Sequence, residues 1–583
     1  MNSVRNGLLA ASAIALALTA SPALAQDVPR EQTVIFDLDR TIADPTNFNW
    51  FTPGAYQRVQ GAHQAMWEPL FILNYESGEI EPWLGTSFEP NDTLDTWTLT
   101  LRDGVEWSDG EPFNADDVIF TINMLLGDET AALQEAANMQ QWVESVEKID
   151  DHTVQFNLVG ANPRFPLDYF SVRIFGSLLI MPEHVWAGQD PETFKFYDEE
   201  QGWPIGTGPY TFTTADTSRA VWDRNDDWWG AAAGFMELPE PQRLIWLESG
   251  TEENRAQLLA NNQLDAAQTV TLGAFEVIQA MNPAIIAWHG GMPFSWPDPC
   301  ARQLEFNTTV APWDDPNMRR AINNIIDRDQ IVNVAYEGTT IPSRTMFVEY
   351  AAMAPFIDAI LAEGMTLPTS ANLDEARALI EGAGYTLDGD IYERDGEPLT
   401  ADIIVNSAST ELTRAVDLIV EQFRRAGIDA IARPVENSVF WGTVLPLGEY
   451  DLAYTWLSCG SVNEPWASMN RYTNHFVVPV GERSPGFNNS ARWDTEATAS
   501  YTAIVDEIGS MPLGDPAIPG MVAEAYQYFH DEMPFIPLVQ ASKLLPYNTT
   551  YWTGWPTAED NYIHPAHWWN HTHRIIHNLE PAQ

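Results

Sequence analysis

Five of the eleven histidines lie within the last twenty residues of the chain. Imidazole is a common ligand of transition metals, so this group is the clearest candidate for metal binding. The group consists of His564, His567, His571, His573 and His577, with Trp568, Trp569, Ile575 and Ile576 between them. Because apolar side chains alternate with the imidazoles, we expect the segment to pack against the protein, and a metal site is the lesser alternative.

The other polar residues form no catalytic motif. The sequence contains no Gly-x-Ser-x-Gly, His-Glu-x-x-His, Cys-x-x-Cys or Walker phosphate loop. A glycosidase needs a catalytic pair of carboxylates. Because the chain has 82 acidic residues, the sequence does not single out any such pair. We therefore predict a protein that is not an enzyme and needs no cofactor, and keep a secreted hydrolase as the alternative class.

Cys300 and Cys459 are the only two cysteines. In an oxidising compartment such a pair can form one disulfide bond. Their spacing alone does not decide between that bond and two free thiols.

Acidic residues outnumber basic residues by 82 to 29, which gives a formal net charge of -53. Only Lys148, Lys195 and Lys543 are lysines. The resulting negative field repels nucleic acid and anionic lipid, and it disfavours the compact state at low salt. We predict adaptation to high salt, with an ordinary acidic secreted protein as the alternative.

Residues 1–25 have the pattern of a secretory signal peptide. Arg5 precedes an apolar run over residues 8–20, and Ala23-Leu24-Ala25 is a small-x-small cleavage site. The run is too short to span a bilayer comfortably. We expect cleavage near Ala25 and a periplasmic protein, and an uncleaved membrane anchor is the alternative.

The elements that would position functional residues follow from hydrophobic periodicity. Trp97, Leu99 and Leu101 alternate with threonines, which predicts a half-buried strand. Asn114 is a predicted helix N-cap, followed by a helix to about Leu126.

A βαβ unit is predicted in the second half of the chain. Its parts are a strand at 403–405, an amphipathic helix at 411–425 and a second strand at 428–433. This arrangement predicts a parallel sheet, to which we add a strand at 452–456. Open α/β sheets place ligands beyond the carboxyl ends of their strands, so the loop at 457–466 is a candidate ligand site.

Several short motifs occur in a fixed order, at residues 97–110, 206–210, 318–323 and 532–538. Together they resemble the extracellular solute-binding proteins of family 5, the dipeptide and oligopeptide receptors of bacterial ABC importers. The resemblance covers nearly the whole mature chain. It implies capture and delivery of a solute to a permease by a monomeric receptor.

The resemblance also implies a fold. Family members are α/β proteins of the two-lobed periplasmic binding type, type II and cluster C-like, with three domains and a hinge that encloses the ligand between the lobes. The expected division is a signal peptide at 1–25, domain I at 26–73, 206–296 and 546–583, domain II at 74–205, and domain III at 297–545. Some oligopeptide-binding relatives carry cysteines at the positions of Cys300 and Cys459, which favours a disulfide bond between them.

Two positions depart from the peptide-binding pattern. Ser461 stands where many peptide receptors have an Asp that pairs with the ligand ammonium, and Thr455 stands where some have an Arg. A serine supplies no charge to a desolvated ammonium. This difference counts against an ordinary peptide ligand.

Aromatic side chains favour a different solute. The sequence predicts ligand contacts from six residues, namely Asn437, Trp441, Trp456, Ser461, Asn463 and Trp466. Flat rings suit sugar faces, and amides or hydroxyls suit sugar hydroxyls. We therefore slightly favour an oligosaccharide or another neutral solute. Peptide uptake is the main alternative; a receptor for nickel or for chemoreception alone is a lesser one.

Overall fold

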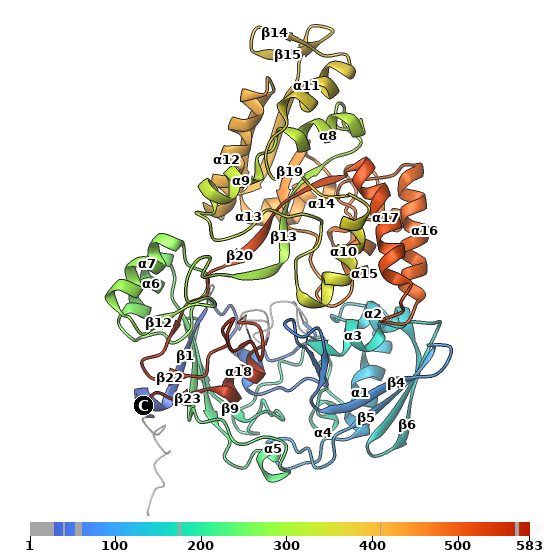
Figure 1. Ribbon diagram of the computed structural model, residues 1–583. Helices are drawn as coiled ribbons and strands as arrows, with labels where there is room; N and C mark the ends of the chain where they lie inside the picture. Colours follow the sequence, from blue (N-terminus) through green and yellow to red (C-terminus); the bar gives the residue numbers. More distant parts are fainter. Residues whose placement is uncertain (1–27, 39–40, 53–60, 173–176, 409, 566–570) are drawn as a thin grey trace, which may run out of the picture.

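The computed structural model describes residues 28–38, 41–52, 61–172, 177–408, 410–565 and 571–583. The chain folds into two lobes, one above the other in Figure 1. Strand β13 (Trp296–Phe306) begins at the junction between the lobes, and strand β20 (Phe535–Lys543) ends there. They pair antiparallel, with Trp296 opposite Lys543. The described chain therefore passes from one lobe to the other through two neighbouring strand ends. The signal peptide predicted at 1–25 lies outside the described residues.

A four-stranded mixed sheet forms one part of the lower lobe, in the order β1-β11-β10-β9. Its strands are β1 (Thr33–Leu38), β11 (Arg243–Glu248), β10 (Arg219–Arg224) and β9 (Tyr210–Ala215). Helices α6 (Glu252–Ala260) and α7 (Leu272–Met281) follow it in the chain and lie at one side of the lobe junction.

A second sheet forms the other part of the lower lobe, in the order β4-β5-β7-β6. The strands are β4 (Gly85–Pro90), β5 (Thr96–Leu101), β7 (Thr153–Leu158) and β6 (Val143–Asp150). The predicted alternation in β5 is confirmed, because Trp97, Leu99 and Leu101 are buried. The predicted cap is confirmed too: Asn114 and Asp117 form a capping box at the start of α1 (Ala115–Leu126).

Beside this sheet lies the small sheet β3-β2-β8, built from β2 (Phe71–Leu73), β3 (Ile80–Pro82) and β8 (Ser171–Val172).

Two glycines let separate segments of the lower lobe touch. A Cβ added to Gly206 would lie 2.2 Å from the carbonyl oxygen of Met66, and one added to Gly208 would lie 2.7 Å from it. The backbone N–H of Gly208 donates to the same oxygen at 2.6 Å. The segment that contains Gly206 and Gly208 therefore serves packing, because only residues without a side chain let its backbone come this close to Met66.

The upper lobe contains a five-stranded sheet in the order β18-β17-β19-β13-β20. The predicted unit is confirmed as β17 (Thr400–Asn406), α12 (Thr410–Arg425) and β18 (Asp429–Val435), and β19 (Leu452–Thr455) lies beside β17. The predicted parallel pairing is confirmed, because β17 pairs parallel with both β18 and β19. The sheet extends beyond these three strands: β13 pairs antiparallel with both β19 and β20, so the whole sheet is mixed.

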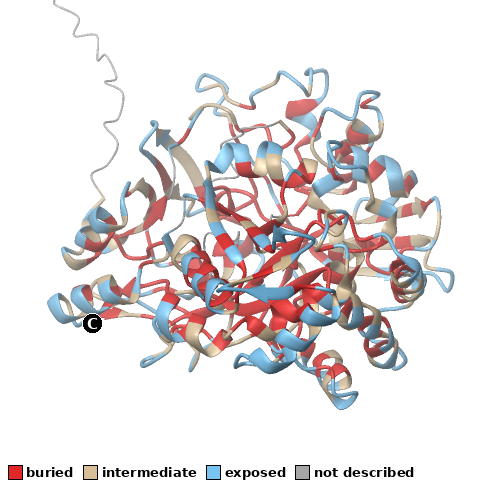
Figure 2. Cartoon of the chain, turned by 90° about the horizontal axis from the view of Figure 1, so that it is seen from above, coloured by how far each residue is buried: buried red, intermediate tan, exposed pale blue. Residues whose placement is uncertain are grey.

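Helices cover the faces of this sheet. Leu412, Val416, Ile419 and Phe423 recur at helical spacing along α12 and are buried. Other helices of the lobe include α8 (Pro316–Ile325), α10 (Ala354–Ala362), α11 (Leu373–Gly382), α15 (Trp466–Asn470), α16 (Glu496–Ser510) and α17 (Ile518–Glu532). Figure 2 shows buried residues along the central strands and exposed residues on the outer helical faces.

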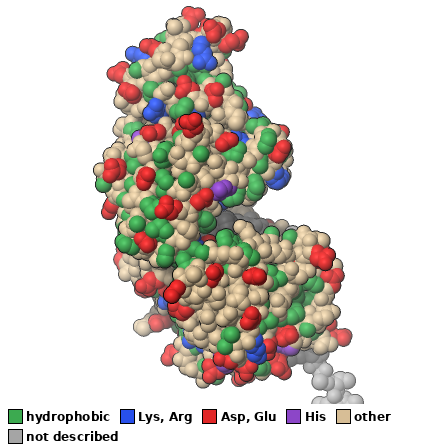
Figure 3. All heavy atoms as spheres, turned by 90° about the vertical axis from the view of Figure 1, so that its right-hand side faces the viewer, with side chains coloured by type: hydrophobic (Ala, Val, Ile, Leu, Met, Phe, Trp, Pro, Cys, Tyr) green, Lys and Arg blue, Asp and Glu red, His purple; other side chains and the backbone are tan. Residues whose placement is uncertain are grey.

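Acidic side chains are spread over the surface, with few basic ones, on the face seen in Figure 3. Within the described ranges, no helix has both the length and the apolar character needed to cross a bilayer. The three-domain boundaries given above remain a prediction.

Candidate functional site between the lobes

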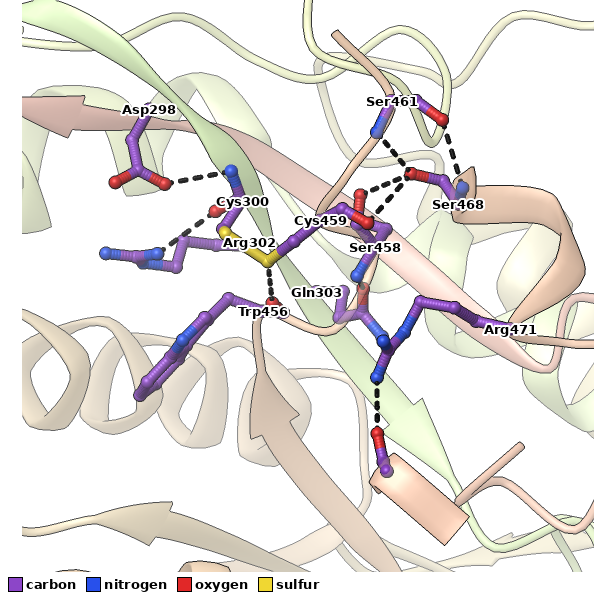
Figure 4. The surroundings of a disulfide bond; sticks show 11 residues. Asp298, Cys300, Arg302, Gln303, Trp456, Ser458, Cys459, Ser461, Ser468 and Arg471 are labelled. Carbon is purple, nitrogen blue, oxygen red and sulfur yellow. Dashed lines mark hydrogen bonds between the residues drawn. A yellow bond between two sulfur atoms is a disulfide. The ribbon is translucent and has the colours of Figure 1, made fainter. Parts of the chain in front are cut away.

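A disulfide bond joins Cys300 of β13 to Cys459 of the loop after β19, with 4.4 Å between their Cα atoms (Figure 4). The bond fixes the loop that was predicted to face a ligand to a central strand of the upper lobe. Asp298 accepts a hydrogen bond from the N–H of Cys300 at 2.8 Å, which shapes the strand next to the bond.

Trp441 and Trp456 lie together. Their ring centroids are 4.8 Å apart in an edge-to-face arrangement, and Phe487 packs on Trp441 at 5.4 Å. The guanidinium of Arg302 lies 5.3 Å from the ring of Trp456. Both tryptophans are half-buried, so part of each ring is still exposed.

Ser461 is placed differently from the prediction. Its hydroxyl donates to the carbonyl oxygen of Pro465 at 2.9 Å and accepts from the N–H of Ser468 at 3.0 Å. The residue is buried, and its own N–H donates to the Ser468 hydroxyl (Figure 4). These bonds use the side chain to fold the loop.

The other three predicted residues lie apart from one another. Asn437 is exposed, and its side-chain oxygen accepts from Asn406 at 2.7 Å. Asn463 lies beside the Gly78 turn of the lower lobe, because a Cβ added to Gly78 would be 3.4 Å from the Asn463 Cβ. Trp466 packs against Arg164 of the lower lobe, 5.1 Å from the guanidinium to the ring centroid.

A cavity of about 410 Å³ lies between the lobes, beside the end of β20. The lower lobe contributes Glu252 and the segment 269–272 between α6 and α7. The upper lobe contributes the segment 335–339, the start of α12 and the last residues of β20. None of the six residues predicted to bind the ligand lines this cavity.

Charged groups of both signs line the cavity. Glu411 pairs with Arg302 at 3.0 Å, and Glu337 pairs with Arg414 at 2.9 Å. Lys543 also lines the wall. Burial raises the pKa of Glu411, but the charges of Arg302 and Lys543, together with hydrogen bonds from Arg302 and Tyr336, hold that pKa below its ordinary value. Glu411 is therefore a carboxylate at neutral pH.

Hydrogen bonds hold Glu252 of the cavity wall and Arg302, the ion-pair partner of Glu411. Arg302 lies in β13 and donates from Nη1 to the carbonyl oxygen of Cys300 at 3.1 Å, which holds its guanidinium next to the start of α12. Glu252 accepts from the N–H and the hydroxyl of Thr271, at 2.8 and 2.7 Å. Both charges are held in place before any solute arrives.

Sequence reasoning missed Glu411, Arg414 and Lys543. The rule that ligands lie beyond the carboxyl ends of parallel strands was applied to β19 alone. Applied to β17, it would have pointed to the start of α12, where Glu411 and Arg414 lie. The scarcity of lysine would have singled out Lys543.

The described histidines of the C-terminal segment are packed among other side chains. His564 and His571 lie 3.9 Å apart between ring centroids, and Tyr75 stacks on His564 at 4.0 Å. Burial lowers the pKa of His573 to about 3 and that of His577 to about 4. His567 lies outside the described residues. Among all the described residues, including these histidines, no group of three or more His, Cys, Asp or Glu side chains is arranged to hold a metal ion.

Comparison with known proteins adds to this geometry. Residues 79–476 match the family model described as bacterial extracellular solute-binding proteins, family 5 Middle. The nickel-binding periplasmic protein of Escherichia coli K12 is 28% identical over 415 residues, covering 69% of this chain and 72% of that protein. The periplasmic oligopeptide-binding protein OppA of Salmonella typhimurium is 22% identical over 538 residues, covering 86% and 90%.

A solved structure has the same fold. The mannohexaose-bound periplasmic oligopeptide-binding protein of Thermotoga maritima superposes with a TM-score of 0.75 at 22% identity, covering 95% of this chain and 99% of that one. The predicted two-lobed α/β architecture is therefore confirmed. Since the family model spans more than half of the sequence, the chain belongs to the bacterial extracellular solute-binding proteins of family 5.

Proposed function

We propose that this protein is the periplasmic receptor of an ABC importer, which encloses a solute between its lobes and presents it to a membrane permease. The observation that carries the proposal is the cavity of about 410 Å³ lined from both lobes beside the strands that join them. A solute that touches both walls favours the closed arrangement, because it has more contacts there than in an open one.

The charges of the cavity favour a solute with charges of its own. Lys543 and Arg414 suit a carboxylate, and Glu411 and Glu252 suit an ammonium group. A neutral sugar would displace water from these groups on closure without adding an opposite charge, which is costly. We therefore put a short peptide first, ahead of the neutral solute that the sequence favoured.

An oligosaccharide is the second candidate. The half-buried pair of Trp441 and Trp456 offers flat aromatic surface near the disulfide bond. The structural neighbour from Thermotoga maritima is bound to mannohexaose, so this fold accommodates a sugar in at least one other protein.

A melting panel separates the two solutes. The protein from Gln26 to Gln583 is mixed with di- to hexapeptides and with di- to hexasaccharides, and the midpoint of unfolding is measured for each. A solute that binds only the folded state raises stability by about 2.7 kcal/mol at one hundred times its Kd.

We expect shifts with peptides that are lost in Lys543→Gln. The matched control is Lys148→Gln, because Lys148 pairs with Asp116 on the lower-lobe surface far along the chain from the cavity residues. Shifts with sugars alone would reverse the order of the two candidates, and no shift with either class would contradict both.

A further inference from the structure

Arg164 and Glu464 form a buried ion pair between the lobes. Arg164 precedes α3 (Phe165–Tyr169) in the lower lobe, and Glu464 lies in the upper lobe just before α15. The distance from Arg164 Nε to Glu464 Oε2 is 3.1 Å, and the two side chains are 1% and 7% exposed. Figure 1 places α3 directly below α15 and α16, on the side away from α6 and α7.

Arg164 makes further contacts with the upper lobe. Its Nη1 donates to the carbonyl oxygens of Ile508 and Gly509, at 3.2 and 2.8 Å, where α16 ends. These are carbonyls of the last helical turn, which favours a cation. The guanidinium also lies over the ring of Trp466. One side chain of the lower lobe thus contacts two separate segments of the upper lobe, 464–466 and 508–509.

Glu464 is held in place for this contact. Its two carboxylate oxygens accept from the N–H groups of Trp466 and Ala467, at 2.9 and 3.2 Å. These bonds are made within the upper lobe, so the carboxylate keeps its position whether or not Arg164 is present.

Close packing accompanies the ion pair. A Cβ added to Gly78 of the lower lobe would lie 2.5 Å from the Cβ of Ala352 in the upper lobe. A Cβ added to Gly509 would lie 2.5 Å from Trp466 Nε1, so the glycine makes room for the ring that Arg164 covers. The contact is therefore closely fitted, unlike the cavity beside β20.

We propose that Arg164 and Glu464 form a latch that holds the two lobes together on the flank opposite α6 and α7. The latch rests on the lobe movement in the proposed function but on no particular solute. Separation of the lobes returns both charges to water, which limits the cost of opening. Within the described part of the chain, Nη2 of Arg164 has no hydrogen-bond partner, so the closed contact is incompletely satisfied and can open again.

The test measures the distance between the lobes without solute. Cysteines replace Asp92 in the lower lobe and Ala503 in the upper lobe; both sites are exposed, and the native cysteines are bonded to each other. Spin labels at these sites report the distribution of distances by pulsed EPR. In Arg164→Gln we expect the ratio of closed to open molecules to fall about tenfold or more, because one partner of a buried ion pair is lost.

Two further variants complete the experiment. Glu464→Gln should give the same shift, and it decides the question if Arg164→Gln fails to fold. Lys195→Gln removes an exposed ion pair with Asp44 inside the lower lobe and should leave the distances unchanged. Folded Arg164→Gln and Glu464→Gln proteins with wild-type distances would overturn the latch. Because no solute is used, a failed melting panel would not be mistaken for a failed latch.

Discussion

The two flanks of the lobe junction are built on different principles. On the flank of α6 and α7, charges of both signs line a cavity of about 410 Å³. On the flank of α3, the Arg164–Glu464 ion pair is buried among close contacts. Charges that line a cavity can change partners when a solute arrives, whereas buried charges are strongly destabilised when one partner is lost. The comparison assigns solute recognition to the first flank and closure to the second.

The disulfide bond connects the two flanks, and its loss should have the largest effect. Replacing Cys300 and Cys459 by alanine releases a bond that closes a loop with a sequence separation of 159. We expect the free energy of unfolding to fall by about 2–5 kcal/mol, because the unfolded chain regains freedom. Denaturant titration measures this.

The same variant should loosen the flank of α3 more than the cavity, because the loop after β19 carries Glu464. Equal loosening of both flanks by hydrogen exchange would break the proposed separation.

Arg302 tests the cavity flank through its ion pair with Glu411. Arg302→Met leaves the Glu411 carboxylate, which is 26% exposed, without its ion pair. We expect a loss of about 2–3 kcal/mol in the free energy of unfolding, less than for a fully buried pair because water still reaches Glu411. Adding Glu411→Leu should recover most of the loss. No recovery in the double variant would mean that Arg302 acts by packing on Trp456 instead.

A pH titration tests whether acid destabilises the lower lobe through His573 without changing the contact between the lobes. His573 donates from Nε2 to the carbonyl oxygen of Trp67 at 3.0 Å, and burial lowers its pKa to about 3. The folded state therefore disfavours the protonated imidazole, and stability is lost as pH falls below the ordinary value of about 6.5.

Relative to wild type, His573→Asn should gain about 2 kcal/mol between pH 6.5 and pH 5, since each pKa unit is worth about 1.4 kcal/mol. The difference in unfolding free energy between wild type and variant is taken at each pH, so that the contributions of the other titrating groups cancel. A constant difference over this pH range would contradict the account of His573, and a changed lobe distance would mean that acid acts on the junction as well.

Salt should give the smallest effect and should act mainly outside both flanks. Raising NaCl from 0.1 M to 1 M shortens the Debye length from about 10 Å to about 3 Å, which weakens repulsion among the surface acids. We expect a gain of about 1 kcal/mol or less in unfolding free energy, with little change in the lobe distance. A melting temperature that is the same at both salt concentrations would argue against adaptation to high salt.

Much of the fold could be predicted from local sequence patterns. Asn114 caps α1, and the apolar spacing of α12 identifies its buried face, because each signal lies within one element. The antiparallel pairing of β13 could not be read in this way. Its partners in the sheet, β19 and β20, lie far away in sequence, and pairing direction depends on how the chain crosses between the lobes.

The site was harder to predict. The sequence placed Ser461 at a ligand position, but the loop uses its hydroxyl for internal bonds with Pro465 and Ser468. The residue type determines which hydrogen bonds a side chain can form. The conformation of the loop determines which of them are formed. Glu411 and Lys543 approach each other across more than one hundred residues, so no local pattern joins them.

Hydrogen exchange with and without the peptide that gives the largest melting shift tests the central claim most directly. We predict that the peptide slows exchange in both walls of the cavity, at residues 269–272 and 335–339. Residues 163–169 should exchange slowly even without peptide, because the flank of α3 is already buried. Protection confined to one lobe, or absent from both walls, would contradict a solute enclosed in this cavity.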